Sequence, residues 1–122
     1  MISSTLTQEV THLHADLCSA LADPTRLLLL YALSDQPHNV TELTQELNVP
    51  QPTVSRHLKI LREGGLVKAT RQGPSVQYEL TDHRVIDALD LLRSILRDRI
   101  QHRASLIVDS EYEFYPLNEE QK

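Results

Sequence analysis

QPTVSRHLKILRE, residues 51–63, is the stretch of sequence that decides the fold of this 122-residue chain. On a helical wheel Val54, Leu58 and Leu61 recur at steps of four and three, so one face of the stretch is apolar and must pack on other elements. The opposite face carries Arg56 among Lys, Ser, Thr and Gln side chains. Such side chains suit base edges and phosphates, so the stretch is a candidate recognition helix for nucleic acid.

A second short helix is predicted directly before this stretch. Asn39 or Thr41 can cap it, and Glu42 stands three residues after Asn39, which is capping-box spacing. Residues 48–50, Asn-Val-Pro, end this helix, and Gly64 is well placed for a left-handed C-cap of the recognition helix. Two short helices joined by about four residues form a helix-turn-helix unit.

A β-hairpin is predicted after the recognition helix. Residues 66–71 and 76–80 flank residues 72–75, which contain Gly and Pro, and the second run alternates apolar and polar side chains. A two-stranded hairpin is not stable alone, so it must lean on the helices. Next to a helix-turn-helix unit, such a hairpin is expected to form a wing.

The rest of the sequence predicts three further helices. Leu and Val recur at steps of three and four over residues 5–21, which marks an amphipathic first helix. Asp23-Pro24 is an N-cap followed by proline at the first helical position, and it starts a second helix over residues 25–33. The last helix is expected to begin after Thr81 and to run past residue 100.

The last helix has more apolar surface than one edge of a small core would use. Its apolar positions are Val85, Ile86, Leu89, Leu91, Leu92, Ile95, Leu96 and Ile100. Such an excess marks a dimer surface, with the first helix as its companion; the alternative is a single long helix that covers its own core. The expected fold class is mainly α with a small β-hairpin: a winged helix-turn-helix of five helices that dimerises through the first and last.

The charge is unevenly distributed along the chain. The net charge is −5, but residues 106–122 sum to −4 and residues 53–72 sum to +4, so the first 105 residues carry only −1. Local field rather than total charge decides where a polyanion docks. The alternative for the basic stretch is a face that is merely solvated.

The sequence shows neither a membrane segment nor a secretion signal. The longest apolar run, residues 27–33, is far shorter than the roughly 20 residues that span a bilayer. The N-terminus lacks the basic region and apolar core of a signal peptide. The single cysteine, Cys18, cannot form an internal disulfide, which agrees with a reducing compartment. We therefore expect a cytoplasmic protein.

Two regions are expected in the chain. Residues 1–105 should form one winged domain for DNA binding and dimerisation, followed by an acidic tail at residues 106–122. The tail holds Tyr112, Phe114 and Tyr115 and has no helical period. Two alternatives stand for it: the tail is disordered, or its aromatic side chains dock on the folded body.

Three blocks of sequence carry a resemblance to a known family. They are Leu21-Ala22-Asp23-Pro24-Thr25-Arg26, then Val40-Thr41-Glu42-Leu43, then QPTVSRHLKILREGGLV at residues 51–67. In this order and spacing they resemble the ArsR/SmtB family of winged-helix repressors, over about residues 6–105. The resemblance implies a dimeric bacterial transcription regulator that binds an inverted-repeat operator and releases it when an inducer binds.

Two departures from the family pattern bear on DNA binding. The recognition helix usually begins with Ser, and Pro50 stands there instead, so the first amides lack a side-chain cap and are left for a phosphate. The wing often has a further basic residue after its glycine, whereas Pro74 follows Gly73 here. Arg71 then has to supply most of the charge of the wing.

The leading hypothesis is a dimeric, sequence-specific DNA-binding repressor with an unidentified inducer. Base edges are assigned to Gln51, Thr53, Ser55 and Arg56, and phosphates to His57, Lys59, Arg62 and Arg71. The alternative from another class is a winged-helix protein-interaction module that uses the acidic tail and the last helix. An enzyme is not expected, because the sequence shows no Gly-rich phosphate loop and no convincing pair of catalytic groups.

No complete metal-sensing site is recognised. The family's thiolate site needs cysteines at residues 40–44, where there are none. Its other site lies in the last helix across the dimer; there Asp82 and Asp98 match the carboxylates, but the histidine positions fall on Arg84 and Ile95. No cofactor is assigned from the sequence, and a shifted site for zinc or another divalent metal is the alternative. Its residues are Asp82, His83, Asp98 and His102.

Cys18 is the redox candidate. It follows Leu17 on the helix assigned to the dimer, where the simplest interpretation is a small buried hydrophobe. A redox role requires Cys18 to meet its symmetry mate.

Overall fold

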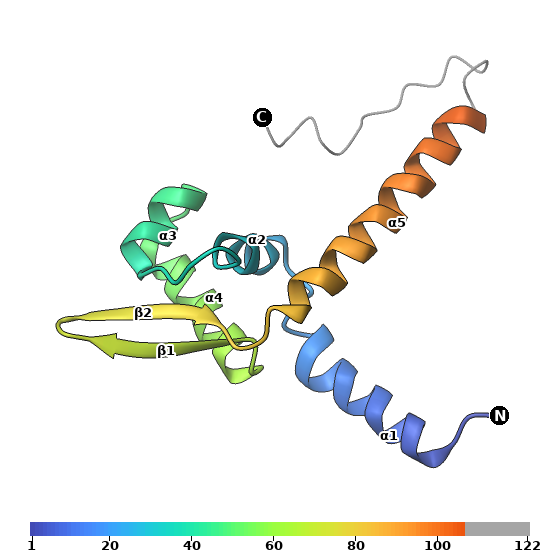
Figure 1. The fold of residues 1–122 in the computed structure, drawn as a ribbon, viewed down its shortest axis with the longest axis horizontal. Helices are drawn as coiled ribbons and strands as arrows, with labels where there is room; N and C mark the ends of the chain where they lie inside the picture. The colour runs from blue at the N-terminus through green and yellow to red at the C-terminus, as the bar shows by residue number, and fades with distance from the viewer. Residues whose placement is uncertain (107–122) are drawn as a thin grey trace. The chain divides into compact units, whose positions relative to one another are not determined.

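A computed structural model describes residues 1–106 of the chain, and Figure 1 shows its elements. In chain order these are the helix α1 (Ser4–His12), the π-helical segment η1 (Leu13–Cys18), the helices α2 (Pro24–Ala32), α3 (Val40–Leu47) and α4 (Gln51–Glu63), the strands β1 (Val67–Gln72) and β2 (Ser75–Leu80), and the helix α5 (Arg84–Leu106). The chain divides into two compact units, of which the first is residues 1–86 and the second begins at Asp87.

Side-chain caps fix where α2 and α3 begin. The Asp23 carboxylate accepts the Arg26 amide at 3.4 Å, and Pro24 is the first residue of α2. Asn39 caps α3 in a complete capping box: its side chain accepts the Glu42 amide at 2.8 Å, and its own amide donates to the Glu42 carboxylate at 2.9 Å. Both predicted helix starts are confirmed, and of the two candidates for α3 Asn39 is the cap.

The core of the first unit lies where α3 and α4 pack on α2. Its fully buried side chains are Leu29, Leu30, Leu33, Leu43, Val54, Leu58 and Leu61. The predicted apolar face of residues 51–63 is therefore the buried face of α4, and the predicted bounds of this helix are confirmed. Each buried Leu contributes roughly 1.5–3 kcal/mol, so the orientation of α4 about its own axis is strongly determined.

A tight turn joins α3 to α4 and completes the helix-turn-helix. Asn48 ends α3 in the left-handed conformation, with φ 55° and ψ 48°, which Asn tolerates better than most residues. The Val49 amide donates to the Thr44 carbonyl at 3.3 Å, and Pro50 then precedes α4. The predicted break at residues 48–50 is confirmed.

The end of α4 differs by one residue from the sequence expectation. Gly64 has φ −80°, and the left-handed residue is Gly65, with φ +78°. The Leu66 amide donates to the Leu61 carbonyl at 2.9 Å and the Gly65 amide to the Arg62 carbonyl at 3.0 Å, which is the Schellman arrangement. The prediction that Gly64 takes the left-handed position is wrong, because the helix includes one more residue before it reverses.

Gly64 matters for a different reason. A Cβ atom at this position would lie 3.0 Å from the Asp16 carbonyl oxygen and 3.2 Å from the Ala20 Cβ atom. The end of α4 therefore approaches the backbone of η1 so closely that a side chain at residue 64 would require the neighbouring atoms to shift.

The predicted hairpin is present and is longer than expected. Strands β1 and β2 pair antiparallel from Val67 with Leu80 to Gln72 with Ser75, which leaves a two-residue turn. Gly73, the first turn residue, has φ +63°, as in a type II′ turn. Backbone bonds of 3.0 and 2.8 Å between His38 and Tyr78 attach the hairpin to the segment before α3, which meets its need for support.

The N-terminal helix is not the continuous α-helix predicted over residues 5–21. After α1 the chain widens into η1, where the Ser19 amide donates to the His14 carbonyl, five residues back, at 3.2 Å. The three- and four-residue spacing of apolar side chains does not reveal such a shift, since only the hydrogen-bond partner changes by one residue. No residue of α1 or η1 is buried.

The last helix begins and extends as predicted, since α5 starts at Arg84 and passes residue 100. Four of its apolar side chains are exposed: Leu91, Leu92, Ile95 and Leu96. The expectations for the acidic tail, including Tyr112, Phe114 and Tyr115, fall outside the residues that the structure describes. Within residues 1–106, no helix is both long and apolar enough to cross a bilayer.

Candidate nucleic-acid interface

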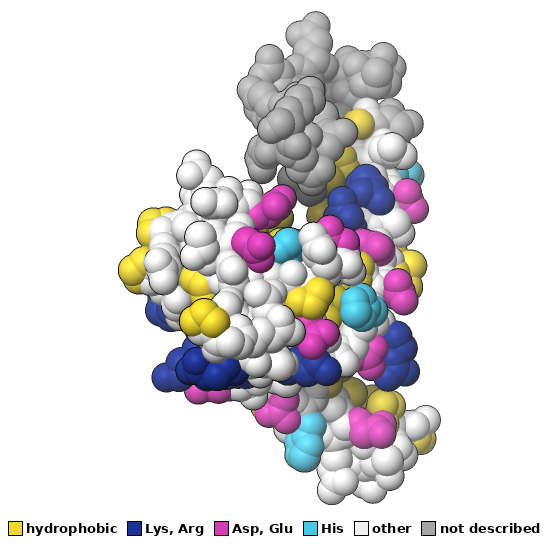
Figure 2. All heavy atoms as spheres, turned by 60° about the vertical axis from the view of Figure 1, so that its left-hand side comes forward, with side chains coloured by type: hydrophobic (Ala, Val, Ile, Leu, Met, Phe, Trp, Pro, Cys, Tyr) yellow, Lys and Arg dark blue, Asp and Glu magenta, His cyan; other side chains and the backbone are white. Residues whose placement is uncertain are grey.

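The face of α4 opposite the core carries polar and basic side chains. Its exposed residues include Gln51, Ser55, Arg56, Lys59 and Arg62, and Thr53 is half-buried at the edge. With the left side of Figure 1 turned forward, Figure 2 shows dark-blue Lys and Arg side chains gathered in a band, with Asp and Glu beside them. The sequence-based candidates on α4, other than His57, thus share one accessible surface.

The hairpin adds one exposed cation near its tip. Arg71 lies directly opposite Val76 in the register, and its guanidinium lies 3.5 Å from the Gly73 carbonyl oxygen. Lys68, further down β1, is 3.9 Å from the Glu79 carboxylate on the paired strand. Arg71 is therefore the basic residue of the wing whose charge has no carboxylate partner among the described residues.

The start of α4 offers fewer free amides than the sequence suggested. Pro50 provides no side-chain cap, as expected. However, the Thr53 and Val54 amides both donate to the Pro50 carbonyl, at 3.0 and 3.1 Å, and Pro52 has no N–H. In this first turn only the Gln51 N–H is left for an anion, so phosphates have to be held mainly by side chains.

His57 is not part of this surface. Its exposure is 6 %, and it stands three residues after Val54 and four before Leu61, on the buried face. Its Nδ1 lies 3.1 Å from Arg26 Nη1, and its Nε2 lies 3.5 Å from Asp23 Oδ2. The prediction that His57 holds a phosphate is corrected, because a buried ring paired on both sides cannot reach DNA.

The surroundings of His57 keep its ring neutral at pH 7. Burial lowers its pKa below the usual 6.5; the Asp23 carboxylate opposes this shift, and the Arg56 and Arg26 cations add to it. A guanidinium only donates, so Nδ1 must accept from Arg26 and the ring proton resides on Nε2, facing Asp23. Because the folded pKa is depressed, the unfolded state binds the proton more readily, and stability falls as the pH drops below about 6.5.

Sequence reasoning missed Arg26 as the partner of this histidine. The Arg26 side chain also donates from Nε to the Ala20 carbonyl at 2.6 Å and from Nη2 to the Ser19 carbonyl at 3.4 Å. The available signal was the position of His57 on the apolar stripe of the wheel, which required an internal polar partner.

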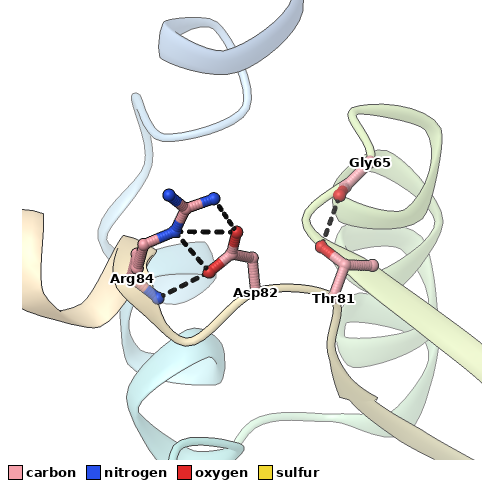
Figure 3. A network of polar contacts seen from close by, with 4 residues as sticks. All are labelled: Gly65, Thr81, Asp82 and Arg84. Carbon is pink, nitrogen blue, oxygen red and sulfur yellow. Dashed lines mark hydrogen bonds and ion pairs between the residues drawn. The ribbon is translucent and has the colours of Figure 1, made fainter.

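The proposed shifted metal site is not assembled within one chain. Among residues 1–106, no three His, Cys, Asp or Glu side chains form a group that could hold a metal ion. Asp82 instead pairs with Arg84, whose Nη2 lies 2.7 Å from Oδ2 and whose Nε lies 3.1 Å from both carboxylate oxygens (Figure 3). His83, Asp98 and His102 are exposed, and a site shared between two subunits remains a prediction.

The segment that precedes α5 is also bonded to the segment that follows α4. The Thr81 hydroxyl donates to the Gly65 carbonyl at 2.7 Å (Figure 3), and the Thr81 amide donates to the Leu66 carbonyl at 3.1 Å. The Arg84 guanidinium and amide lower the pKa of Asp82 to about 2. Asp82 is therefore held as an anion by a cation from its own chain.

Cys18 ends η1 as an exposed free thiol. The interpretation of Cys18 as a small buried hydrophobe concerned the dimer interface, and it stays a prediction because the exposure is that of a single chain. Whether it meets a symmetry mate is a property of a dimer and stays a prediction.

Comparison with known proteins assigns the family. The model of the arsR family of bacterial regulatory proteins matches residues 23–69. A "Probable mercury resistance operon repressor" from Streptomyces lividans is 36% identical over 102 residues, which cover 80% of this chain and 82% of that protein. The chain belongs to the ArsR family of bacterial regulatory proteins. It is thereby placed in a family of transcriptional regulators.

Two further comparisons bear on this member of the ArsR family. The repressor SmtB of Mycobacterium tuberculosis is 41% identical over 86 residues, which cover 67% of this chain and 64% of the length of SmtB. The homodimeric winged helix-turn-helix DNA-binding domain of a Mycobacterium bovis protein has a TM-score of 0.70 at 25% identity, covering 83% of this chain and 93% of that domain. The predicted winged helix-turn-helix fold is confirmed.

The pair of Asp82 and Arg84 gives a direct test of the geometry around the start of α5. We expect Asp82 to titrate near pH 2 and its pKa to rise toward 3.8 in Arg84→Gln, since the guanidinium is lost and the backbone donor remains. The depressed pKa contributes stability at pH values above about 3.9, and this contribution is lost as the pH falls toward 2. Carboxyl carbon shifts measured by NMR against pH report both values.

The matched control is Arg93→Gln on α5, which removes an arginine close to Asp90 and should leave the Asp82 titration unchanged. An Asp82 carboxyl that titrates at its ordinary value in the unaltered protein would contradict the pairing.

Proposed function

We propose that this protein is a dimeric, sequence-specific DNA-binding repressor that binds an inverted-repeat operator with α4 and is released by an inducer. The observation that carries the proposal is the two-sided character of α4. One face is fixed in the core by three fully buried side chains, Val54, Leu58 and Leu61, and the other presents exposed polar and basic ones. Membership of the ArsR family supports the same proposal.

The order of side chains along α4 suits insertion into the major groove. In helix-turn-helix proteins, residues near the start of the recognition helix contact base edges. Gln51, Thr53, Ser55 and Arg56 lie in the first two turns and supply donors and acceptors for bases. Lys59 and Arg62 follow at exposed positions further along, where a straight helix leaves the groove and meets the phosphates. His57 is excluded from this set by its burial.

Arg71 is proposed as the phosphate contact of the wing. The hairpin that carries it is short and is attached through Tyr78 to His38, so Arg71 projects from a supported position. A contact to phosphate contributes affinity without sequence preference and depends on salt, because it releases counterions. Pro74 adds no charge at the tip, so this single cation carries the contribution of the wing.

Two copies of the chain are needed to read a symmetric operator. The exposed apolar side chains of α1 and α5, which include Leu6 and Val10 on α1, offer a surface that water disfavours. A second copy, related by a two-fold axis, is the occupant that would also place two recognition helices about one turn of DNA apart. The homodimeric relative from Mycobacterium bovis supports this arrangement.

Substitution of the two arginines should separate base reading from phosphate contact. Arg56→Ala should weaken binding to preferred DNA by roughly 1–3 kcal/mol, while changing affinity for unrelated DNA much less. Arg71→Ala should weaken binding to both DNAs alike and reduce the slope of log affinity against log salt by about one. Fluorescence anisotropy with DNA from upstream of the chain's own gene, at several salt concentrations, measures these effects.

Arg103→Ala serves as control, since it removes the same charge from an exposed position on α5. An Arg56→Ala protein that keeps its full preference would exclude the assigned role of Arg56. A protein with no operator preference at low micromolar concentration would instead favour the protein-interaction module.

A charge placed on the exposed apolar face of α5 should break the dimer. Leu92, 61% exposed, is replaced by Glu, which would have to be buried without a partner in the interface. Sedimentation velocity should then show monomer where the unaltered protein is dimeric, with the helical content unchanged by circular dichroism. Leu28→Glu on α2 is the matched control, because Leu28 is 57% exposed and lies outside both proposed dimer helices. A dimer that survives Leu92→Glu but not Leu28→Glu would place the interface elsewhere.

A further inference from the structure

We propose that Arg26 is a positioning residue for the recognition helix: through the ring of His57 it ties α4 to the residues that join η1 to α2. A change in the N-terminal helix is thereby transmitted to the surface that contacts DNA. The effect on DNA rests on the function proposed above, whereas the tie itself is a property of the free protein.

The Arg26 guanidinium joins three parts of the chain. Its Nε and Nη2 atoms donate to the carbonyls of Ala20 and Ser19, at 2.6 and 3.4 Å. These carbonyls follow the last residue of η1, near the C-terminal end of the N-terminal helical segment, where a cation is favoured; the Ser19 carbonyl also accepts the Ala22 amide at 3.3 Å. Arg26 therefore caps the end of the N-terminal helical segment while standing in the first turn of α2.

The third nitrogen atom of the Arg26 guanidinium contacts α4. Its Nη1 lies 3.1 Å from His57 Nδ1, which has to present a lone pair because a guanidinium has none to offer. The proton of the ring is then on Nε2, 3.5 Å from the Asp23 carboxylate. The neutral ring of His57, in a single tautomer, thus lies between the Arg26 donor and the Asp23 acceptor, which both belong to the start of α2.

A second contact makes the tie rigid. Seven residues beyond His57, a Cβ atom at Gly64 would stand 3.0 Å from the Asp16 carbonyl oxygen and 3.2 Å from the Ala20 Cβ atom, so a side chain there would require the neighbouring atoms to shift. Helix α4 consequently meets the N-terminal segment both at its middle and at its end. Because the segment it meets is π-helical, a form that is rare and frequently found at functional sites, η1 is a natural place for a change to enter.

Loss of the contact between Arg26 and His57 would change the position of the DNA-binding face of α4. Arg56 is adjacent to His57 in sequence and points to solvent, so a small rotation of α4 moves it directly. A protonated ring has no lone pair for Arg26 and places a third positive charge beside Arg26 and Arg56, opposed only by Asp23. Acid should therefore loosen α4, although exposed histidines that gain a proton would by themselves strengthen binding to a polyanion.

The first arm of the test is hydrogen exchange of α4 amides in the free protein, corrected for the intrinsic effect of pH. Going from pH 7.5 to 5.5, protection of α4 should fall by about fivefold, the worth of one hydrogen bond. His57→Gln keeps a donor and an acceptor but does not titrate, so its protection should not change with pH. Arg26→Gln should lower protection of η1 and α4 together already at pH 7.5, and Arg26→Lys, which lacks the fork, should do the same.

The second arm measures the affinity for preferred DNA over the same pH range. The unaltered protein should bind more weakly at pH 5.5 than at pH 7.5, again by roughly fivefold, and His57→Gln should lose this decrease. His12→Gln, at an exposed position on α1, is the control and should keep the decrease.

Equal pH profiles for the unaltered protein and His57→Gln in both arms would overturn the inference. So would Arg26 variants that leave the exchange of α4 untouched, and these variants decide the matter even where His57→Gln does not fold. Exchange that follows the expected pattern in a protein that binds no DNA at any pH would support the tie and exclude the proposed function instead.

Discussion

The burial of one face of α4 is the constraint on which the rest of the structure depends. Val54, Leu58 and Leu61 are fully excluded from water among leucines of α2 and α3, and together they define how α4 is turned about its axis. Rotation by a third of a turn would expose these side chains and bury arginine and lysine, at a cost far above the marginal stability of a small domain. The orientation of the basic face is thus determined by the need to keep the apolar side chains of the opposite face out of water.

The other features hold this helix at its two ends. Asn48 in the left-handed conformation sets the angle at which the chain enters α4, and the reversal at Gly65 sets how it leaves toward the hairpin. From there the chain is bonded back, because Thr81 donates to Gly65 just before α5 begins. The hairpin and the segment that leads into α5 are therefore both attached at the C-terminal end of α4.

Much of this could be predicted from sequence, because capping and apolar spacing are local properties. Asn39 with Glu42, Asp23 with Pro24 and the break at residues 48–50 mark helix ends that the structure shares. The partner of His57 depends on two segments 31 residues apart, and no local pattern encodes their distance. The π-helical segment and the close approach at Gly64 likewise depend on how the elements pack. The basic surface could be predicted from a helical wheel of residues 51–63. The error at His57 arose because it was grouped with the basic residues, although the wheel places it on the apolar face.

In the proposed dimer, two copies of α4 bind the two halves of a symmetric DNA site. Hydroxyl-radical footprinting on DNA selected from a random library by the unaltered protein tests it most directly. We expect two protected half-sites in inverted orientation, with centres about 10 base pairs apart on one face of the duplex. A single protected half-site, or selected DNA without inverted symmetry, would contradict it.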